Sequence, residues 1–250
     1  MPTLPPAVAL SCAVVASLRA AGGIVIGKTN CHEFFYGIQG DVGAFGAAVN
    51  PHDPQRITGG SSSGSAAAVA AGIVPIALGT DTAGSVRVPA ALCGVVGFKP
   101  TTGSLSGSGI FPLAPSFDTA GILSGSIADA EVVWNALASN GTKHFQDPTR
   151  GSDVTENTVI TVGTLADAAA WAGSIEVLNA FSRAVSVLDA VGHEIAMVSL
   201  NSEYDFGKIY NVIRAAEAYV VHQGLLAESA EAYQPKTIKR IRTGEFLTYS

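Results

Sequence analysis

The feature that most constrains the fold is a stretch from Ile57 to Thr80 without a single charged residue. It is nearly as long as a membrane span, but its glycines, serines and Pro75 make it a poor one. Within it, residues 66–71 are strong helix formers and residues 73–78 predict a buried strand. The stretch therefore favours a helix followed by a buried strand rather than a membrane anchor.

Apolar runs and helical patterns alternate along the rest of the chain. Helices are predicted over residues 7–20, 86–92, 127–137, 175–188 and 204–227, and strands over residues 23–26, 94–98, 159–162 and 193–198. Residues 100–116 and 139–157 are predicted to be loops, with no internal repeat and no clear linker. Short strands that alternate with helices indicate a single α/β domain whose sheet is covered on both faces.

Composition argues against one class of partner. Apolar residues make up 48% and charged residues 14% of the chain, which allows a sizeable core and argues against disorder. A net charge of −6 with scattered basic residues argues against direct binding of nucleic acid. Three cysteines without metal-ligand spacing predict buried thiols in a reducing compartment, hence a cytoplasmic protein.

Two further motifs, a phosphate loop and a nucleophile elbow, match in residue pattern but not in the local structure that they require. Residues 22–29 fit the phosphate-loop pattern, but their central Ile-Val-Ile belongs in a strand and no helix start follows. Residues 60–64 fit the nucleophile-elbow pattern, which needs an apolar strand directly before it. The preceding residues 54–59 do not form such a strand, so both interpretations are weak.

A third pattern uses two separated serines. The predicted strand runs into Thr80-Asp-Thr-Ala-Gly-Ser85, and a helix is predicted to start near Val86. Backbone N–H groups at a helix start suit a developing oxyanion, and Gly84 lets the backbone approach a substrate closely. Ser85, beside those donors, is well placed as a nucleophile.

These motifs resemble the amidase signature family, whose members hydrolyse amides with a Ser–cis-Ser–Lys triad. The resemblance lies in residues 20–30, 50–54, 59–72, 78–81, 84–85, 93–101, 111–119 and 126–130. It is strong over the signature core 13–137 and weak over a substrate-side region, residues 139–250. It implies an incomplete amidase signature fold, a mixed twisted sheet covered by helices on both faces, as one partial domain over residues 1–250.

The resemblance implies a role for each matching residue. Ser85 corresponds to the acyl-accepting nucleophile, and Ser61 to the bridging serine, 24 residues earlier (85 − 61 = 24), with a cis Gly60–Ser61 peptide. The remaining roles are an oxyanion hole and its support. The oxyanion hole corresponds to the N–H groups of Thr82, Ala83, Gly84 and Ser85, and Ser62, Asp81 and Arg87 correspond to supporting positions. The implied substrate is a small-molecule amide, and the implied chemistry requires no metal and no cofactor.

One departure from the family pattern concerns the lysine base. Its position falls before Met1, and neither Lys28 nor Lys99 matches it. The family's C-terminal third is also absent, so we expect a chain truncated at both ends that alone is inactive or nearly so. Alternatives are the A subunit of an aminoacyl-tRNA amidotransferase, which Val88 disfavours, and a non-catalytic homologue. A homodimer or a partner subunit stays open.

Overall fold

The structure is a computed structural model, and it describes residues 12–141, 159–200 and 204–247. Contacts divide the chain into two compact units, residues 1–145 with 207–250, and residues 146–206. In the described part of the chain, no helix combines the length and apolar character that a membrane crossing needs.

The first unit is built on a three-stranded antiparallel sheet in the order β1-β3-β2. Its strands are β1 (Ile76–Asp81), β2 (Val96–Phe98) and β3 (Thr119–Ser124). The central strand β3 aligns Asp81 with Thr119 at one end and Ile76 with Ser124 at the other. The end of β1 therefore lies directly beside the start of β3. The turn that carries Ser85 begins at this end of β1.

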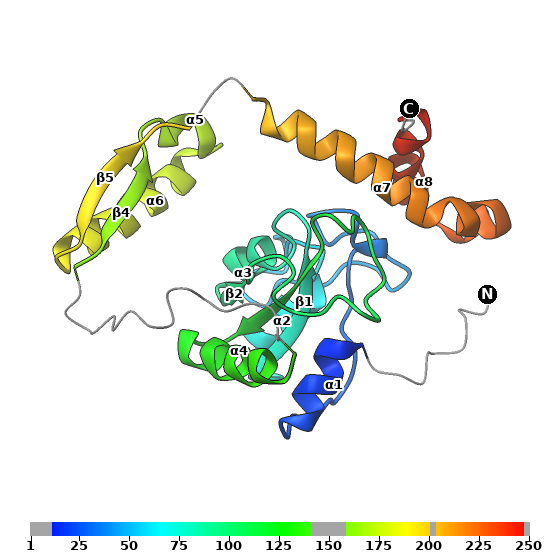
Figure 1. Ribbon diagram of the computed structural model, residues 1–250, viewed down its shortest axis with the longest axis horizontal. Coiled ribbons are helices and arrows are strands. Elements are labelled where there is room, and N and C mark those ends of the chain that lie inside the picture. Colours follow the sequence, from blue (N-terminus) through cyan, green and yellow to red (C-terminus); the bar gives the residue numbers. More distant parts are fainter. Residues whose placement is uncertain (1–11, 142–158, 201–203, 248–250) are drawn as a thin grey trace. The chain divides into compact units, whose positions relative to one another are not determined.

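Helices cover both faces of this sheet, as the sequence predicts (Figure 1). One face, which includes Ile122, packs against α1 (Ala13–Ala20) and α4 (Ile127–Gly141). The opposite face, which includes Leu123, packs against α2 (Ser63–Ala70) and α3 (Arg87–Cys93). Adjacent strand residues point to opposite faces, so β3 supplies both cores.

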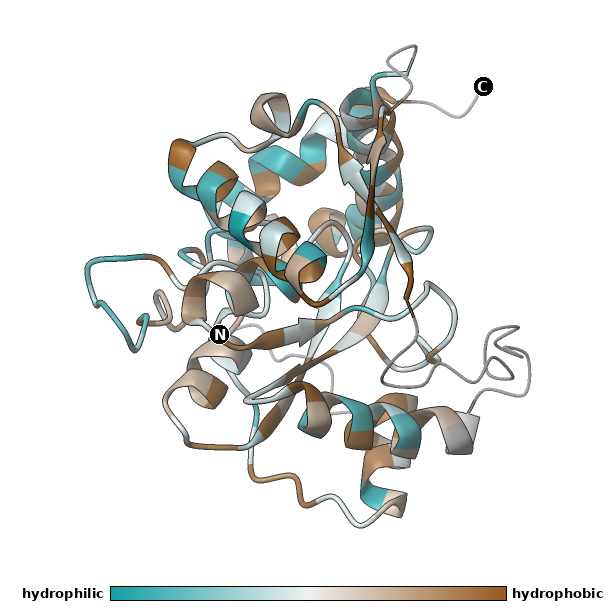
Figure 2. Cartoon of the chain, turned by 90° about the vertical axis from the view of Figure 1, so that its left-hand side faces the viewer, coloured by the Kyte–Doolittle hydropathy of each residue, from teal (hydrophilic) through white to brown (hydrophobic). Residues whose placement is uncertain are grey.

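Helix α4 shows how the sequence pattern produces this packing. In Figure 2, where it leads into a grey trace, hydrophobic and hydrophilic residues alternate around it. The hydroxyl of Ser126 accepts a hydrogen bond from the Asp129 N–H at 3.1 Å, which caps the helix start. The predicted loop 139–157 falls mostly on residues outside the described ranges.

In the first unit one strand prediction is wrong and one strand was not predicted. Residues 23–26 form no strand, and Ile24 and Ile26 are 88% and 71% exposed. No described strand pairs with this segment, and an apolar run without a partner cannot form a ladder. Conversely, β3 was not predicted, although all six of its residues are buried.

The C-terminal helices belong to the same unit. Helix α7 (Phe206–Ser229) buries Ala215, Ala216, Ala218 and His222, and α8 (Pro235–Arg242) buries Ile241. The Glu33 carboxylate, in the short 3-10 helix η1 (Glu33–Phe35), accepts the Gln234 N–H at 3.0 Å. The 3-10 turns η2 (Ala230–Ala232) and η3 (Thr243–Phe246) flank α8.

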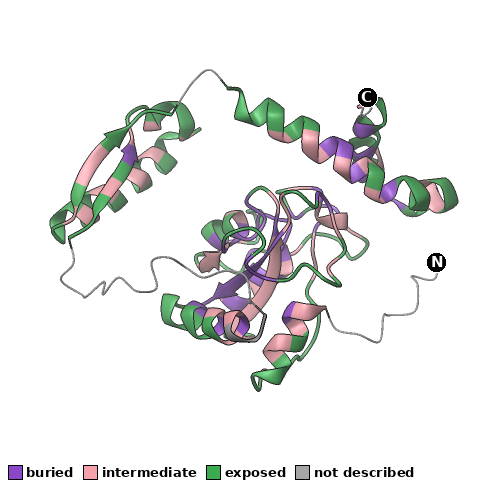
Figure 3. Cartoon of the chain, viewed as in Figure 1, coloured by how far each residue is buried: buried purple, intermediate pink, exposed green. Residues whose placement is uncertain are grey.

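The second unit is a parallel pair of strands with two helices. Strands β4 (Thr161–Leu165) and β5 (Glu194–Val198) are connected through α5 (Ala168–Trp171) and α6 (Ile175–Ala190). Figure 3 shows little buried surface in this unit, where Thr164 is the one buried residue among those described.

Candidate active site

The segment that contains Ser61 passes close to the backbones of other glycines. The Gly60–Ser61 peptide is cis, as the resemblance implied. A side chain at position 60 would meet the backbone nitrogen of Gly40 at 2.8 Å and the carbonyl oxygen of Gly37 at 3.1 Å, so only glycine fits there. Ser61 is fully buried, and its carbonyl accepts the His32 N–H at 3.0 Å.

The Ser61 hydroxyl is unusual because it makes no hydrogen bond. It is buried, and no acceptor or donor lies within reach among the described residues. Buried hydroxyls are normally paired, so an unpaired one calls for an explanation. Ser63, two residues on at the start of α2, has a buried, unpaired hydroxyl as well.

Ser62 joins the two serine-bearing segments. Its N–H donates to the Ser85 carbonyl at 3.1 Å. Its hydroxyl accepts the Thr80 N–H at 3.2 Å and donates to the Thr80 carbonyl at 3.3 Å. A side chain at Gly79 would meet the Cβ of Ser62 at 2.8 Å, so glycine permits this close approach. The segments of Ser61 and Ser85 are therefore held side by side at the end of β1.

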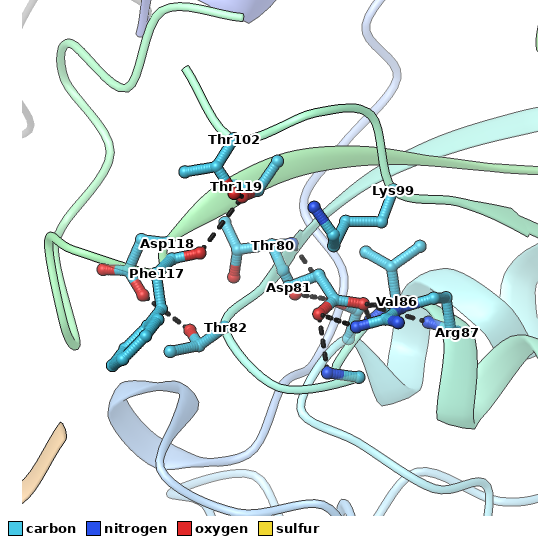
Figure 4. Close-up of polar contacts among 12 residues, drawn as sticks. Thr80, Asp81, Thr82, Val86, Arg87, Lys99, Thr102, Phe117, Asp118 and Thr119 are labelled. Atoms are coloured by element: carbon cyan, nitrogen blue, oxygen red, sulfur yellow. Dashed lines mark hydrogen bonds and ion pairs between the residues drawn. The ribbon is translucent and has the colours of Figure 1, made fainter. Parts of the chain in front are cut away.

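The turn after β1 wraps around the carboxylate of Asp81, which is fully buried. The carboxylate accepts the N–H groups of Gly84 at 2.6 Å and Val86 at 3.2 Å, and two side-chain bonds from Arg87 at 2.9 Å (Figure 4). Burial raises the pKa of Asp81, but these hydrogen bonds outweigh it and hold the pKa below its ordinary value. Asp81 therefore fixes the turn as an anion.

The bonds to Asp81 divide the N–H groups of the turn into engaged and unengaged donors. The Gly84 N–H is engaged by Asp81, and Gly84 adopts a φ of 116° that favours glycine. Within the described part of the chain, the N–H groups of Thr82, Ala83 and Ser85 have no acceptor. Of the four predicted oxyanion donors, these three remain free for a ligand.

A second carboxylate, that of Asp118 directly before β3, contacts the same turn. The hydroxyl of Thr82 donates to Asp118 at 2.5 Å. Burial raises the pKa of Asp118, although hydrogen bonds from Thr82, Leu113 and Ala114 act in the opposite direction. Asp118 lies within the matching residues 111–119, but the sequence analysis assigned it no role. Its position directly before a buried strand is the sequence feature that could have indicated one.

The lysines of the described residues do not reach Ser61. Lys99 donates to the Pro100 carbonyl at 2.7 Å, in agreement with a structural role. Lys28 is exposed and lines a cavity of about 360 Å³ that also touches Ser62 and Thr80 but neither Ser61 nor Ser85. Phe35 and Phe111 lie in the same lining. No group of acidic, histidine or cysteine side chains that could hold a metal occurs among the described residues.

Comparison with known proteins identifies the family. The sequence profile of the Amidase family matches residues 6–249. Indoleacetamide hydrolase of Pseudomonas syringae pv. syringae is 50% identical over 126 residues, covering 50% of this chain and 28% of that protein. The A subunit of the glutamyl-tRNA(Gln) amidotransferase of a Nitratiruptor species is 34% identical over 95% of this chain and 58% of its own length. The chain belongs to the Amidase family.

Solved structures agree at the level of the fold. A crystal structure of an amidase superimposes with a TM-score of 0.86 at 36% identity, covering 99% of this chain and 56% of that one. The mixed α/β architecture is therefore that of amidase signature enzymes, and amide hydrolysis is the chemistry of the family. The chain spans between 28% and 58% of the length of these three relatives.

Proposed function

We propose that this chain carries the acylation site of an amide hydrolase, with Ser85 as nucleophile and Ser61 as bridging serine. The observation that carries the proposal is the bond from the Ser62 N–H to the Ser85 carbonyl at 3.1 Å. It fixes the segment of Ser61 against the turn that presents Ser85. The free N–H groups of Thr82, Ala83 and Ser85 supply donors for an oxyanion in the same turn.

The reaction divides into two displacements at the carbonyl carbon of a small-molecule amide. The Ser85 oxygen attacks that carbon, its proton passes through Ser61, and the carbonyl oxygen becomes an oxyanion. The C–N bond then breaks, and the proton leaves on the amine or ammonia. Water attacks the resulting ester, which frees the carboxylic acid and restores the Ser85 hydroxyl.

The unpaired Ser61 hydroxyl supports a proton-bridging role. A bridging hydroxyl needs a base on one side and the nucleophile on the other, and this hydroxyl is bound by neither in the described residues. The resemblance assigns the base to a lysine, which neither Lys28 nor Lys99 matches. General-base assistance is worth about 10²–10⁴ in rate, so we propose that a lysine supplied beside Ser61 accelerates turnover by about that factor.

A pair of serine variants tests the proposal. Ser61→Ala and Ser63→Ala each remove a buried, unpaired hydroxyl, and the two positions lie two residues apart. We expect Ser61→Ala and Ser85→Ala to abolish hydrolysis of an activated substrate, such as an acyl p-nitroanilide, whereas Ser63→Ala retains it. Equal rates for Ser61→Ala and Ser63→Ala would reject the bridging role.

A second candidate function is that of the A subunit of an amidotransferase. The observation that favours it is the 34% identity with such a subunit over 95% of this chain. Glutaminase activity that rises when a partner subunit is added would favour this candidate over a stand-alone amidase. Binding of a small amide without turnover, even with a supplied lysine segment, would indicate a non-catalytic homologue.

We also propose a reducing, cytoplasmic location for the chain. Cys12, Cys31 and Cys93 are all free thiols. Thiols that stay reduced are typical of the cytosol, because secreted proteins tend to oxidise them.

A further inference from the structure

Asp118 is bound at both of its carboxylate oxygens. Oδ1 accepts the Thr82 hydroxyl at 2.5 Å. Oδ2 accepts the N–H groups of Leu113 at 2.7 Å and Ala114 at 2.9 Å. The Asp118 N–H in turn donates to the Ala114 carbonyl at 2.9 Å. The loop that contains Leu113 and Ala114 therefore fixes the position of the Asp118 carboxylate independently of its bond to Thr82.

Figure 4 shows Asp118 and Asp81 holding the same turn from different sides. Asp81 takes the N–H groups of Gly84 and Val86 and the side chain of Arg87. Asp118 takes the Thr82 side chain and leaves the Thr82 N–H without an acceptor in the described residues. The first residue of the turn is thus held by its hydroxyl while its backbone donor stays free.

We propose that Asp118 is a positioning residue that aims the N–H groups of Thr82 and Ala83 at the oxyanion by holding the Thr82 hydroxyl. This inference rests on the proposed acylation at Ser85. In this role Asp118 acts through Thr82 rather than by contact with the substrate. An N–H donor helps only when it points to the position of the oxyanion, and small displacements in such sites are costly. Loss of the bond should therefore lower kcat more than it raises KM.

A neighbouring hydroxyl pair offers a matched control. The hydroxyls of Thr102 and Thr119 lie 3.0 Å apart, beside Asp118 but without a bond to the turn. Thr102→Val removes a hydroxyl from this pair, as Thr82→Val removes one from the Asp118 pair. Thr82→Ser keeps the hydroxyl, and Asp118→Asn keeps the shape of the carboxylate without its charge.

Three measurements on the full chain test the proposal: kcat and KM, the affinity of a trifluoromethyl ketone analogue of the substrate, and the NMR order parameters of the backbone N–H groups of residues 82 and 83. We expect Thr82→Val and Asp118→Asn to lower kcat and ketone affinity about tenfold or more, with KM within about twofold. The order parameters of residues 82 and 83 should fall in both variants. Thr82→Ser should keep all three measurements near their wild-type values, and Thr102→Val should match the wild type.

The order parameters and the labelling of Ser85 separate the positioning role from the proposed acylation. Lower order parameters at residues 82 and 83 in Thr82→Val, in a chain whose Ser85 is not labelled by a fluorophosphonate, would retain the tether and reject the function proposed for Ser85. Unchanged order parameters in Thr82→Val, or equal kinetic losses in Thr82→Val and Thr102→Val, would overturn the positioning role. If Thr82→Val fails to fold, Asp118→Asn and Thr82→Ser provide the same comparison.

Discussion

The sheets of the two units are built from similar short strands but differ sharply in burial. All six residues of β3 are buried, between α1 and α4 on one face and α2 and α3 on the other. In β4 only Thr164 is buried, and Met197 and Val198 of β5 are 66% and 43% exposed. Apolar strand residues contribute to a core only where helices cover them. The candidate site belongs to the covered sheet, whose strand ends can hold donors in fixed positions.

Truncation of the covered strand should have the largest effect. Ile122 is fully buried in β3, so Ile122→Ala leaves a cavity and should lower the free energy of unfolding by about 2–5 kcal/mol. Val198→Ala, in the exposed strand, should cost less than about 1 kcal/mol. Urea unfolding of both variants measures the contrast, and equal losses would show that the two sheets are alike in solution.

Removal of the Asp81 charge comes next. Asp81→Asn leaves the Arg87 guanidinium and the turn N–H groups without their anion, and should cost about 2–3 kcal/mol. The matched control is Asp53→Asn, because Asp53 pairs with Arg56 in a contact where the side chains are 42% and 79% exposed. Exposed pairs contribute less than about 1 kcal/mol. A control variant as unstable as Asp81→Asn would contradict the distinction.

Acid should destabilise the first unit through His222. This side chain is fully buried beside the Tyr233 hydroxyl, at 2.9 Å from its Nδ1, and between the rings of Phe34 and Phe111. Burial lowers its pKa from 6.5 to about 4. Between these values the unfolded chain binds a proton that the folded chain does not, so stability is present above pH 6.5 and falls as the pH decreases.

The size of this effect follows from the two pKa values. Unfolding free energy should fall by about 2 kcal/mol between about pH 7 and pH 5 from His222 alone. His222→Gln should remove that part of the slope. Urea titrations at both pH values give the slope, and an unchanged slope in His222→Gln would show that another group is responsible.

The smallest effect on stability is expected in residues 23–26, where a strand was predicted but is not found. Ile24 is 88% exposed in a segment with no described strand partner, so Ile24→Thr should change stability by less than about 0.5 kcal/mol. Thermal unfolding compares it with the wild type. A loss near that of Ile122→Ala would mean that residues 23–26 are covered in solution.

Residues 23–26 and β3 also show how much of the fold can be predicted from the sequence. Periodicity predicted the helices around the sheet and the strands β1 and β2, because their apolar patterns are local. It missed β3, whose Thr-Ala-Gly-Ile-Leu-Ser is short and mixed, and whose Gly121 approaches the Val86 side chain. A strand pair is decided by a partner far along the chain, which a local pattern does not contain.

The candidate site likewise contains features that the sequence predicts and features that only the structure shows. The serines and the Asp81 turn could be predicted, because the resemblance aligns them residue by residue. The bond from Asp118 to Thr82 joins positions 36 residues apart, and the engagement of the Gly84 N–H by Asp81 depends on backbone angles. Neither has a signature in residue type or spacing, so only the folded chain reveals them.

The central claim is that Ser85 is the residue that becomes acylated. Intact-mass measurement after treatment with a fluorophosphonate, followed by peptide mapping, tests it most directly, because this reagent forms a stable adduct with an activated serine. We expect one adduct per chain, located on Ser85, with faster labelling when a segment carrying a lysine base is supplied. Labelling that persists in Ser85→Ala, or an adduct that maps to Ser62 or Ser63, would contradict the account.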